Sequence, residues 1–330
     1  MANKLIGFSV NEEAIEIAKR LVIPRQEELG IHCFRQNNGC HIIDMGVNAR
    51  GGWRAGKYYV EMALGGLGEL RYTQKNYAGY SMPAVAVFVD FPDVAEMSSH
   101  VSSCRFIYQG KEITFSGPIR AKRPDRFSKF IPYFDDTQQV LASYQIDSIP
   151  TEDLTDTLAK EAGISPENLY VLVASTGSLV GTIQVCARNV EQAYPTLFVN
   201  QFDLQAIKYA CGITPLVSVV QDEMEAYGRV NDCLIYGQET LLYVDCEDEQ
   251  ITSILPLITM DQERNKDVYA MPFRQIFAKC NNDWCQVPRH WDAPNKLNFY
   301  NLRTNRYFTA GTQCDAVLMS SFWGEKGEII

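Results

Sequence analysis

Arg188 and Glu191, three residues apart, are the side chains whose types and spacing best fit a reaction centre in this sequence. A carboxylate can take up a proton and return it, and a neighbouring arginine can form an ion pair with it. Pairs with this spacing also occur on helix surfaces, where they contribute only ~0.2–0.5 kcal/mol. Arg precedes Glu here, the less favourable order relative to the helix dipole, so helix stability gives little reason for the arrangement. We expect the chemistry at this pair, with a solvated surface pair as the alternative.

The residues before the pair predict a buried strand, a turn and a helix. Residues 170–174 form a short, nearly continuous apolar run, which is typical of a strand covered on both faces, and Gly177 interrupts the run. On the helix that follows, the apolar positions fall on one side, and Gln184, Arg188 and Glu191 gather on the opposite side. We therefore expect one continuous helix that points the pair away from the local core.

A turn rich in hydroxyl groups lies between this strand and this helix. It consists of Ser175, Thr176, Gly177 and Ser178. Such residues cap helices, and the first turn of a helix carries backbone N–H groups that can hold an anion. The turn is therefore a candidate for contact with a substrate.

Six separate blocks of the sequence resemble the methenyltetrahydromethanopterin cyclohydrolases, and they occur in the order of that family. The blocks are SVNE (9–12), IDMGVNARGGWRAG (42–56), PAVAVFVDFP (83–92), SGPIRA (116–121), GRVNDCLIYG (228–237) and DVYAMPFRQIF (267–277). The R-x-x-E pair lies between the fourth and the fifth block. Together these blocks extend the resemblance over nearly the whole chain.

The resemblance implies reversible hydrolysis of the N5,N10-methenyl bridge of tetrahydromethanopterin to the N5-formyl derivative, in the one-carbon metabolism of methanogenesis. The bridging carbon of this cation is already electrophilic, so the enzyme needs neither a metal ion nor a cofactor; it must position one water molecule and accept its proton. Glu191 is the candidate base, and the same group could return the proton to N10. The matching arginine of the family implies that Arg188 holds the carboxylate and favours its ionised form.

The fold that the resemblance implies is α+β, with two lobes of sheets packed with helices and a pocket between them. We expect an N-terminal lobe, residues 1–150, and a C-terminal lobe, residues 151–330, that carries the R-x-x-E pair. Exchange of segments between the lobes is an open alternative. The family is usually trimeric, which implies a homotrimer.

One segment departs from the family pattern. The family usually has G-S-Q-K-A-G-W after its D-x-P block, with a lysine at the active site, whereas this chain reads SSHVSSC at residues 98–104. His100 lies next to the vacant position and could supply a proton-transfer group or a positive charge, although a lone histidine is more often a structural or surface residue. The stretch 281–293 also looks unusual. A pterin-binding homologue without turnover, or a cyclohydrolase for a related pterin or folate carrier, therefore remains an alternative to the active enzyme.

Two further groups of residues are candidates for substrate contact. Arg120 begins a basic cluster around Pro124 that would contact the anionic tail of the phosphate-bearing pterin; the alternative is a solvated loop. Arg229, Asn231 and Asp232 lie in the GRVND block. Their alternative is a helix end or turn in which Asn and Asp bond the nearby backbone.

The composition limits the remaining function classes. The chain has 330 residues, 46% of them hydrophobic, enough for a large core in two lobes. Its net charge of −10 argues against non-specific binding to nucleic acid. The longest apolar runs have the length of strands, far below the ~20 residues of a membrane-spanning helix, and the N-terminus shows no apolar signal core. We expect a cytoplasmic protein that binds neither nucleic acid nor a membrane.

The cysteines and histidines predict no metal site. The ten cysteines are scattered and mostly in apolar surroundings, so we expect reduced core residues. One set resembles metal ligands on paper: His32, Cys33, Cys40 and His41. However, Asn38-Gly39 predicts a two-residue hairpin turn that would place Cys33 opposite Asp44. The two cysteines would then lie roughly 13 Å apart, too far to share one zinc ion.

Overall fold

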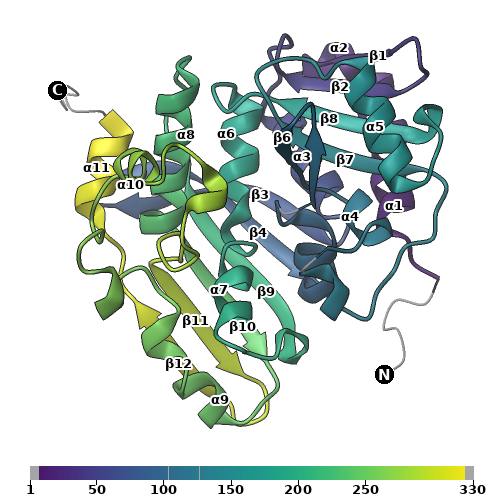
Figure 1. Ribbon diagram of the computed structural model, residues 1–330. Helices are drawn as coiled ribbons and strands as arrows, with labels where there is room; N and C mark the ends of the chain where they lie inside the picture. Colours follow the sequence, from purple (N-terminus) through teal and green to yellow (C-terminus); the bar gives the residue numbers. More distant parts are fainter. Residues whose placement is uncertain (1–6, 103, 126, 324–330) are drawn as a thin grey trace. The chain divides into compact units, whose positions relative to one another are not determined.

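The chain folds into two compact units, each assembled from two separate segments. Unit 1 consists of Met1–Glu69 and Asp93–Gln184, and unit 2 consists of Leu70–Pro92 and Val185–Ile330. The computed structural model describes residues 7–102, 104–125 and 127–323. Both units combine sheets with helices (Figure 1), which confirms the α+β class expected from the sequence.

The division of the chain differs from the single cut near residue 150 that we expected. Strand β7 (Val140–Gln145) and strand β8 (Leu169–Ala174) are parallel neighbours in one sheet, so residues on both sides of position 150 belong to unit 1. Residues 70–92, by contrast, supply strands to the sheet of unit 2. The segment exchange that the sequence left open is therefore the arrangement found.

Unit 1 is built around a four-stranded sheet with β8 between β2 and β7. In spatial order the strands are β1 (His32–Arg35), β2 (His41–Gly46), β8 and β7, and a separate hairpin joins β5 (Cys104–Tyr108) to β6 (Lys111–Phe115). The α-helices are α1 (Val10–Ile17), α2 (Gln26–Leu29), α3 (Trp53–Ala63), α4 (Ile119–Lys122) and α5 (Glu152–Ala162). The shorter helical turns are η1 (Ala18–Val22), η2 (Ile23–Arg25), η3 (Asp93–His100), η4 (Ser128–Phe130) and η5 (Pro166–Asn168).

Strand β8 is covered on both faces, as its apolar run predicts. Tyr170 and Leu172 pack in a core with residues of α1 and α3, whereas Val171 and Val173 pack in a second core with residues of α5. All six residues of the strand are buried. This double burial explains why the sequence of β8 does not alternate between apolar and polar residues.

Unit 2 contains a six-stranded sheet. In spatial order its strands are β12 (Arg306–Gly311), β11 (Lys296–Asn301), β10 (Glu239–Val244), β9 (Ile207–Pro215), β4 (Tyr80–Asp90) and β3 (Gly68–Tyr77). The α-helices after unit 1 are α6 (Leu179–Cys186), at the junction of the two units, then α7 (Ala193–Val199), α8 (Glu223–Asp232), α9 (Asp248–Thr252), α10 (Phe273–Lys279) and α11 (Asp315–Trp323). The shorter turns are η6 (Ala187–Asn189), η7 (Leu204–Ala206), η8 (Cys233–Gly237), η9 (Leu255–Leu257), η10 (Glu263–Asn265) and η11 (Trp284–Gln286).

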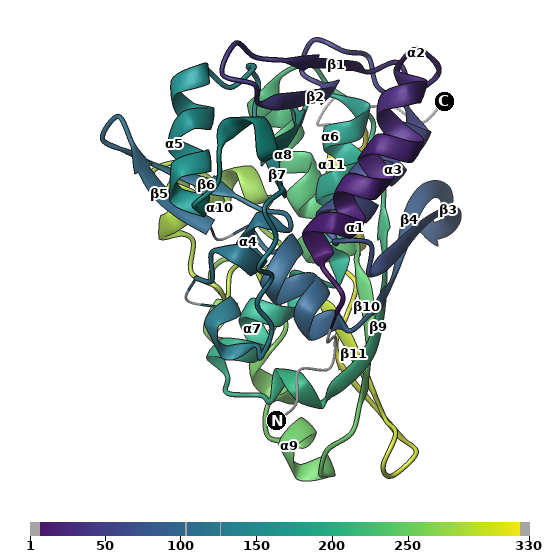
Figure 2. The same cartoon turned by 90° about the vertical axis from the view of Figure 1, so that its right-hand side faces the viewer.

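The two faces of this sheet differ in chemistry. One face carries buried residues such as Ala210, Leu242 and Phe299, and α7 lies on one side of β9, β10 and β11 in Figure 2. The opposite face carries one tyrosine from each of four adjacent strands, in register across the sheet. This tyrosine row consists of Tyr209, Tyr243, Tyr300 and Tyr307. Its two end members are 55% and 57% exposed, so this face presents aromatic surface.

The hairpin of β1 and β2 has a different register from the one we expected. Cys33 lies opposite Ile43, not Asp44, because the turn is one residue longer than a two-residue loop. Gln36 N–H donates to the Cys40 carbonyl, and Gly39 adopts a φ of +91° within the loop. A three-residue loop with glycine in a left-handed conformation is the next common hairpin connection.

Candidate active site

The Arg188–Glu191 pair lies where a helix ends, not within one continuous helix as we expected. Helix α6 stops at Cys186, and Arg188 has non-helical dihedral angles (φ −79°, ψ 18°). The next helix, α7, contains Pro195. A proline cannot donate to the carbonyl four residues earlier, here that of Glu191, and its ring clashes with that group. Pro195 therefore favours the start of a new helix at Ala193, a signal that the periodicity analysis missed, whereas the break at Arg188 lies seven residues before it.

The two side chains form a mostly buried ion pair. Arg188 Nη1 lies 3.3 Å from Glu191 Oε2, and the side chains are only 11% and 13% exposed. The alternative of a solvated surface pair is therefore wrong. Because burial weakens solvent screening, the attraction between the two charges is stronger here than on a helix surface.

Asn189, one of the two residues between the two charges, is fixed against the sheet of unit 2. The Thr240 hydroxyl donates to the Asn189 carbonyl over 2.5 Å. The Asn189 side chain packs over Gly212, where an added Cβ would lie 2.3 Å from Asn189 Oδ1. Glycine at position 212 thus permits a close approach that holds the backbone of the pair in place.

A second ion pair, Arg289 with Asp292, lies beside the Arg188–Glu191 pair and was missed by sequence reasoning. The Gln192 side-chain amide donates to Asp292 Oδ1 over 3.0 Å, and Arg289 Nη1 lies 3.5 Å from Asp292 Oδ2. Burial raises the pKa of Asp292 to about 7, and the negative charge of Glu191 adds to that rise. Two signals could have located this pair: its R-x-x-D spacing resembles that of Arg188 and Glu191, and it lies in the unusual stretch 281–293.

Aromatic side chains adjoin these charged groups. Tyr227 of α8 packs against Trp284 with ring centroids 6.3 Å apart, and the Arg289 guanidinium lies 5.5 Å from the Trp284 ring. Burial raises the pKa of Tyr227, which also feels the charges of Asp292, Arg289 and Arg188. Aromatic rings therefore lie near Asp292 and the two guanidinium groups.

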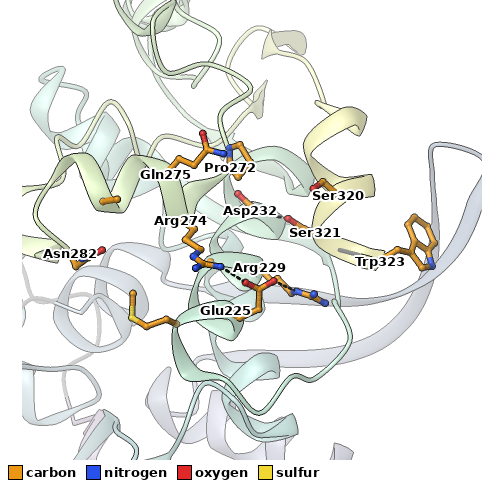
Figure 3. A pocket seen from close by; sticks show the side chains of 13 residues that line it. Glu225, Arg229, Asp232, Pro272, Arg274, Gln275, Asn282, Ser320, Ser321 and Trp323 are labelled. Atoms are coloured by element: carbon orange, nitrogen blue, oxygen red, sulfur yellow. Dashed lines mark hydrogen bonds and ion pairs between the residues drawn. The ribbon is translucent and has the colours of Figure 1, made fainter. Parts of the chain in front are cut away.

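Three of the proposed binding residues, Arg229, Asn231 and Asp232, come from α8. Arg229 and Asp232 line an open pocket of about 1090 Å³ with Arg274, and Figure 3 shows Glu225 between the two arginines. Glu225 accepts from Arg229 over 2.9 Å and from Arg274 over 3.0 Å. In this pocket the guanidinium groups of Arg229 and Arg274 thus share the single carboxylate of Glu225.

The other two residues of this block, Asn231 and Asp232, form hydrogen bonds to other residues of the chain. Asp232 accepts from the Phe273 N–H and the Ser321 hydroxyl, and burial raises its pKa to about 7. Asn231 is buried and donates to the Tyr227 carbonyl. Asn231 thus bonds nearby backbone, which was the alternative to substrate contact.

The hydroxyl-rich turn belongs to unit 1 and caps α6, as its sequence predicts. Ser178 Oγ accepts from the Gly181 N–H over 2.9 Å and donates to the Ser175 carbonyl. The Thr176 hydroxyl accepts from the Gln145 amide. Among these groups, the Ser178 and Thr176 hydroxyls are thus engaged in local bonds.

His100, in unit 1, is buried beside a carboxylate and is not a surface residue. Its Nδ1 lies 3.0 Å from Glu96 Oε2, and both side chains are 1% exposed. Both residues belong to η3. The structure therefore gives His100 a carboxylate partner that the sequence did not predict.

Arg120 is completely buried, so it does not lie in a solvated basic loop. Its guanidinium donates to the Met97 carbonyl over 2.7 Å and to both oxygens of Asp125. These bonds tie α4 to η3 before it and to Asp125 after it. The expectation that Arg120 reaches an anionic substrate tail is not supported by this position.

Two properties of the described residues bear on other functions. Within residues 7–102, 104–125 and 127–323, no three His, Cys, Asp or Glu side chains gather as a metal ion would require. In the same part of the chain, every helix is too short or too polar to cross a bilayer.

Comparisons with known proteins agree on one family. A family model described as "Cyclohydrolase (MCH)" matches residues 9–322. The chain is 33% identical over 320 residues to methenyltetrahydromethanopterin cyclohydrolase of Methanothermobacter marburgensis, covering 95% of this chain and 99% of the relative. It is 31% identical over 326 residues to the protein of the same name from Methanocaldococcus jannaschii, covering 96% of this chain and 99% of the relative.

Proposed function

The chain belongs to the methenyltetrahydromethanopterin cyclohydrolase family, and we propose from this membership that it catalyses the reversible hydrolysis of the N5,N10-methenyl bridge of tetrahydromethanopterin. The product is the N5-formyl derivative, an intermediate of one-carbon metabolism in methanogenesis. The observation that carries the proposal to particular atoms is the buried Arg188–Glu191 pair.

The reaction needs few groups from the protein. The substrate cation has an electrophilic carbon, so a water molecule can add once its proton is accepted. We assign this proton to Glu191, whose carboxylate also attracts the cation. The adduct then loses its N10 bond: Glu191 returns the proton to N10 and accepts the proton of the new hydroxyl group as the formyl C=O forms. One proton per turnover is finally released to solvent, which balances the lost positive charge.

Arg188 is proposed to hold this base in position. Its contact with Glu191 Oε2 leaves the second carboxylate oxygen available for water. Tyr227 and Trp284, which border the charged groups, suit the flat ring of a pterin. The two guanidinium groups of the pocket in Figure 3, Arg229 and Arg274, suit an anionic group of the substrate tail. We propose no resident metal ion or cofactor for this chemistry.

The purified protein, mixed with methenyltetrahydromethanopterin, is expected to remove the absorbance of the methenyl group rapidly. Methenyltetrahydrofolate at the same concentration is expected to react at least about tenfold more slowly, because a pocket built for one carrier loses binding energy with another. Stopped-flow absorbance measures both rates. Binding of the first compound without loss of absorbance would instead identify a pterin-binding homologue.

We further propose that the protein is a homotrimer whose subunits meet at the tyrosine row, Tyr209, Tyr243, Tyr300 and Tyr307. Tyrosine is enriched at protein interfaces because its ring is apolar and its hydroxyl group can still bond. The row lies on the sheet face opposite the Gly212 contact, so an interface there would leave the Asn189 support untouched.

Buried free thiols such as Cys40, Cys186 and Cys233 suit the reducing cytoplasm, where we place the protein.

Replacing both Tyr209 and Tyr307 with Glu is expected to convert the trimer to monomers. Each change would bury a carboxylate at the interface and weaken association by about 2 kcal/mol or more. Light scattering coupled to size-exclusion chromatography measures the mass. Ile107→Glu, at a residue that is 68% exposed in the other unit, is the control and should remain trimeric. A trimer in the double variant would rule out this face.

A further inference from the structure

We propose that Asp292 is a positioning residue of the Arg188–Glu191 site, a second carboxyl group whose charge controls how readily Glu191 takes up a proton. This inference rests on the proposed function. Asp292 acts through Glu191, without contact with the reacting atoms. It would make hydrolysis depend on a group in the stretch 281–293, outside the R-x-x-E pair.

The geometry ties Asp292 to the segment that carries the pair. Gln192, the residue after Glu191, donates its side-chain amide to Asp292 Oδ1 over 3.0 Å, and both side chains are buried. On the other side, Arg289 Nη1 lies 3.5 Å from Asp292 Oδ2. Asp292 is only 8% exposed, so water does little to screen its charge from its neighbours.

Charged and titratable groups face Asp292 from three parts of unit 2. Arg289 comes from its own segment and favours the ionised form, whereas Glu191 comes from the turn after η6 and opposes it. Tyr227 faces Asp292 from α8, and the same tyrosine also feels the charges of Arg188 and Arg289. Two carboxyl groups and two guanidinium groups therefore act on one another in a small volume.

This arrangement predicts a charge change in the neutral pH range. Burial is the main reason that the pKa of Asp292 rises to about 7, so Asp292 is neutral in mild acid and ionised in mild base. An ionised Asp292 adds a negative charge near Glu191 and makes proton uptake by Glu191 from water more favourable. The hydrolytic direction should accelerate as pH rises through about 7.

The test compares the pH profiles of kcat/KM for the wild type and Asp292→Asn between pH 5 and 9. The wild type is expected to show a step with a midpoint near pH 7 and a height of about tenfold, the factor that one unit in the pKa of a base represents. Asp292→Asn, which keeps the size and one acceptor but cannot ionise, is expected to lose this step and stay near the low-pH rate. Asp283→Asn, in the same stretch, is the control and should keep the midpoint. An unchanged midpoint in Asp292→Asn would refute the proposal.

Thermal unfolding provides a readout that does not depend on activity. A carboxyl group whose pKa is higher in the folded than in the unfolded protein binds more protons when folded, so its contribution to stability falls as pH rises from about 4 to about 7. Tm of Asp292→Asn should therefore decline less than that of the wild type over this range. Equal declines would refute the assignment of the titration to Asp292. A smaller decline together with an inactive wild type would support the titration and reject the proposed function instead.

Discussion

Glu191→Gln is expected to lower kcat by about 10²–10⁴-fold, the range attributed to a well-placed general base. The amide has nearly the shape of the carboxylate, but it can neither accept the proton of water nor return one to N10. It also removes the negative charge that attracts the cationic substrate, so KM should rise. The Arg188 guanidinium can still donate to the amide oxygen, and we therefore expect the fold to remain intact.

The measurement is the initial rate of absorbance loss with methenyltetrahydromethanopterin, accompanied by circular dichroism to verify the fold. Glu263→Gln is a matched control, because Glu263 also forms an ion pair with a residue three positions away, Lys266, but its side chain is 89% exposed. This control should retain full activity. A folded Glu191→Gln protein with a near-normal rate would eliminate Glu191 as the base.

Arg188→Met is expected to destabilise the protein by about 3–5 kcal/mol, the typical result of removing one partner from a buried ion pair. The change leaves Glu191, with its 13% exposed side chain, without the cation that now compensates it. The carboxylate should then protonate or move toward water, and either response removes the positioned base. We expect kcat to fall by about 10²-fold or more. Arg188→Lys should keep part of both properties, because lysine restores the charge but not the planar geometry.

Urea unfolding measures the free-energy change and identifies its cause. If the uncompensated carboxylate is responsible, the double variant Arg188→Met/Glu191→Gln should be more stable than Arg188→Met alone. If the double variant is instead less stable by the sum of the two single effects, the two charges do not interact as their 3.3 Å separation indicates.

Local sequence patterns predicted much of the fold. The apolar run of β8 identified a strand that is covered on both faces, and the hydroxyl-rich turn after it predicted the cap that Ser178 provides to α6. These features depend on residues close together in sequence. The register of the first hairpin was displaced by one residue because loop length follows from the backbone conformation of Gly39, which the sequence Asn-Gly alone does not determine.

The candidate site was only half predictable. The R-x-x-E spacing predicted the pair of Arg188 and Glu191, but helical periodicity placed the two on one continuous helix, because it does not detect the break at Arg188 before α7 starts anew. Arg289 and Asp292 lie about a hundred residues further along the chain, and only tertiary contacts bring them beside Gln192. Arg120 was misjudged for the same reason, since no sequence pattern indicated that Asp125 and the Met97 carbonyl would enclose it.

The exchange of residues 70–92 between the units has a consequence for how the protein is made. Strand β4 emerges from the ribosome early, yet its partner β9 follows more than a hundred residues later, with Ala84 opposite Pro215 and Asp90 opposite Tyr209. During synthesis at ≈ 5–20 residues per second, the edge of β4 that pairs with β9 remains unpaired for several seconds. Unpaired edges readily join other chains, so the nascent protein passes through a period of exposure to aggregation. Unit 2 can close its sheet only after unit 1 has been synthesised completely.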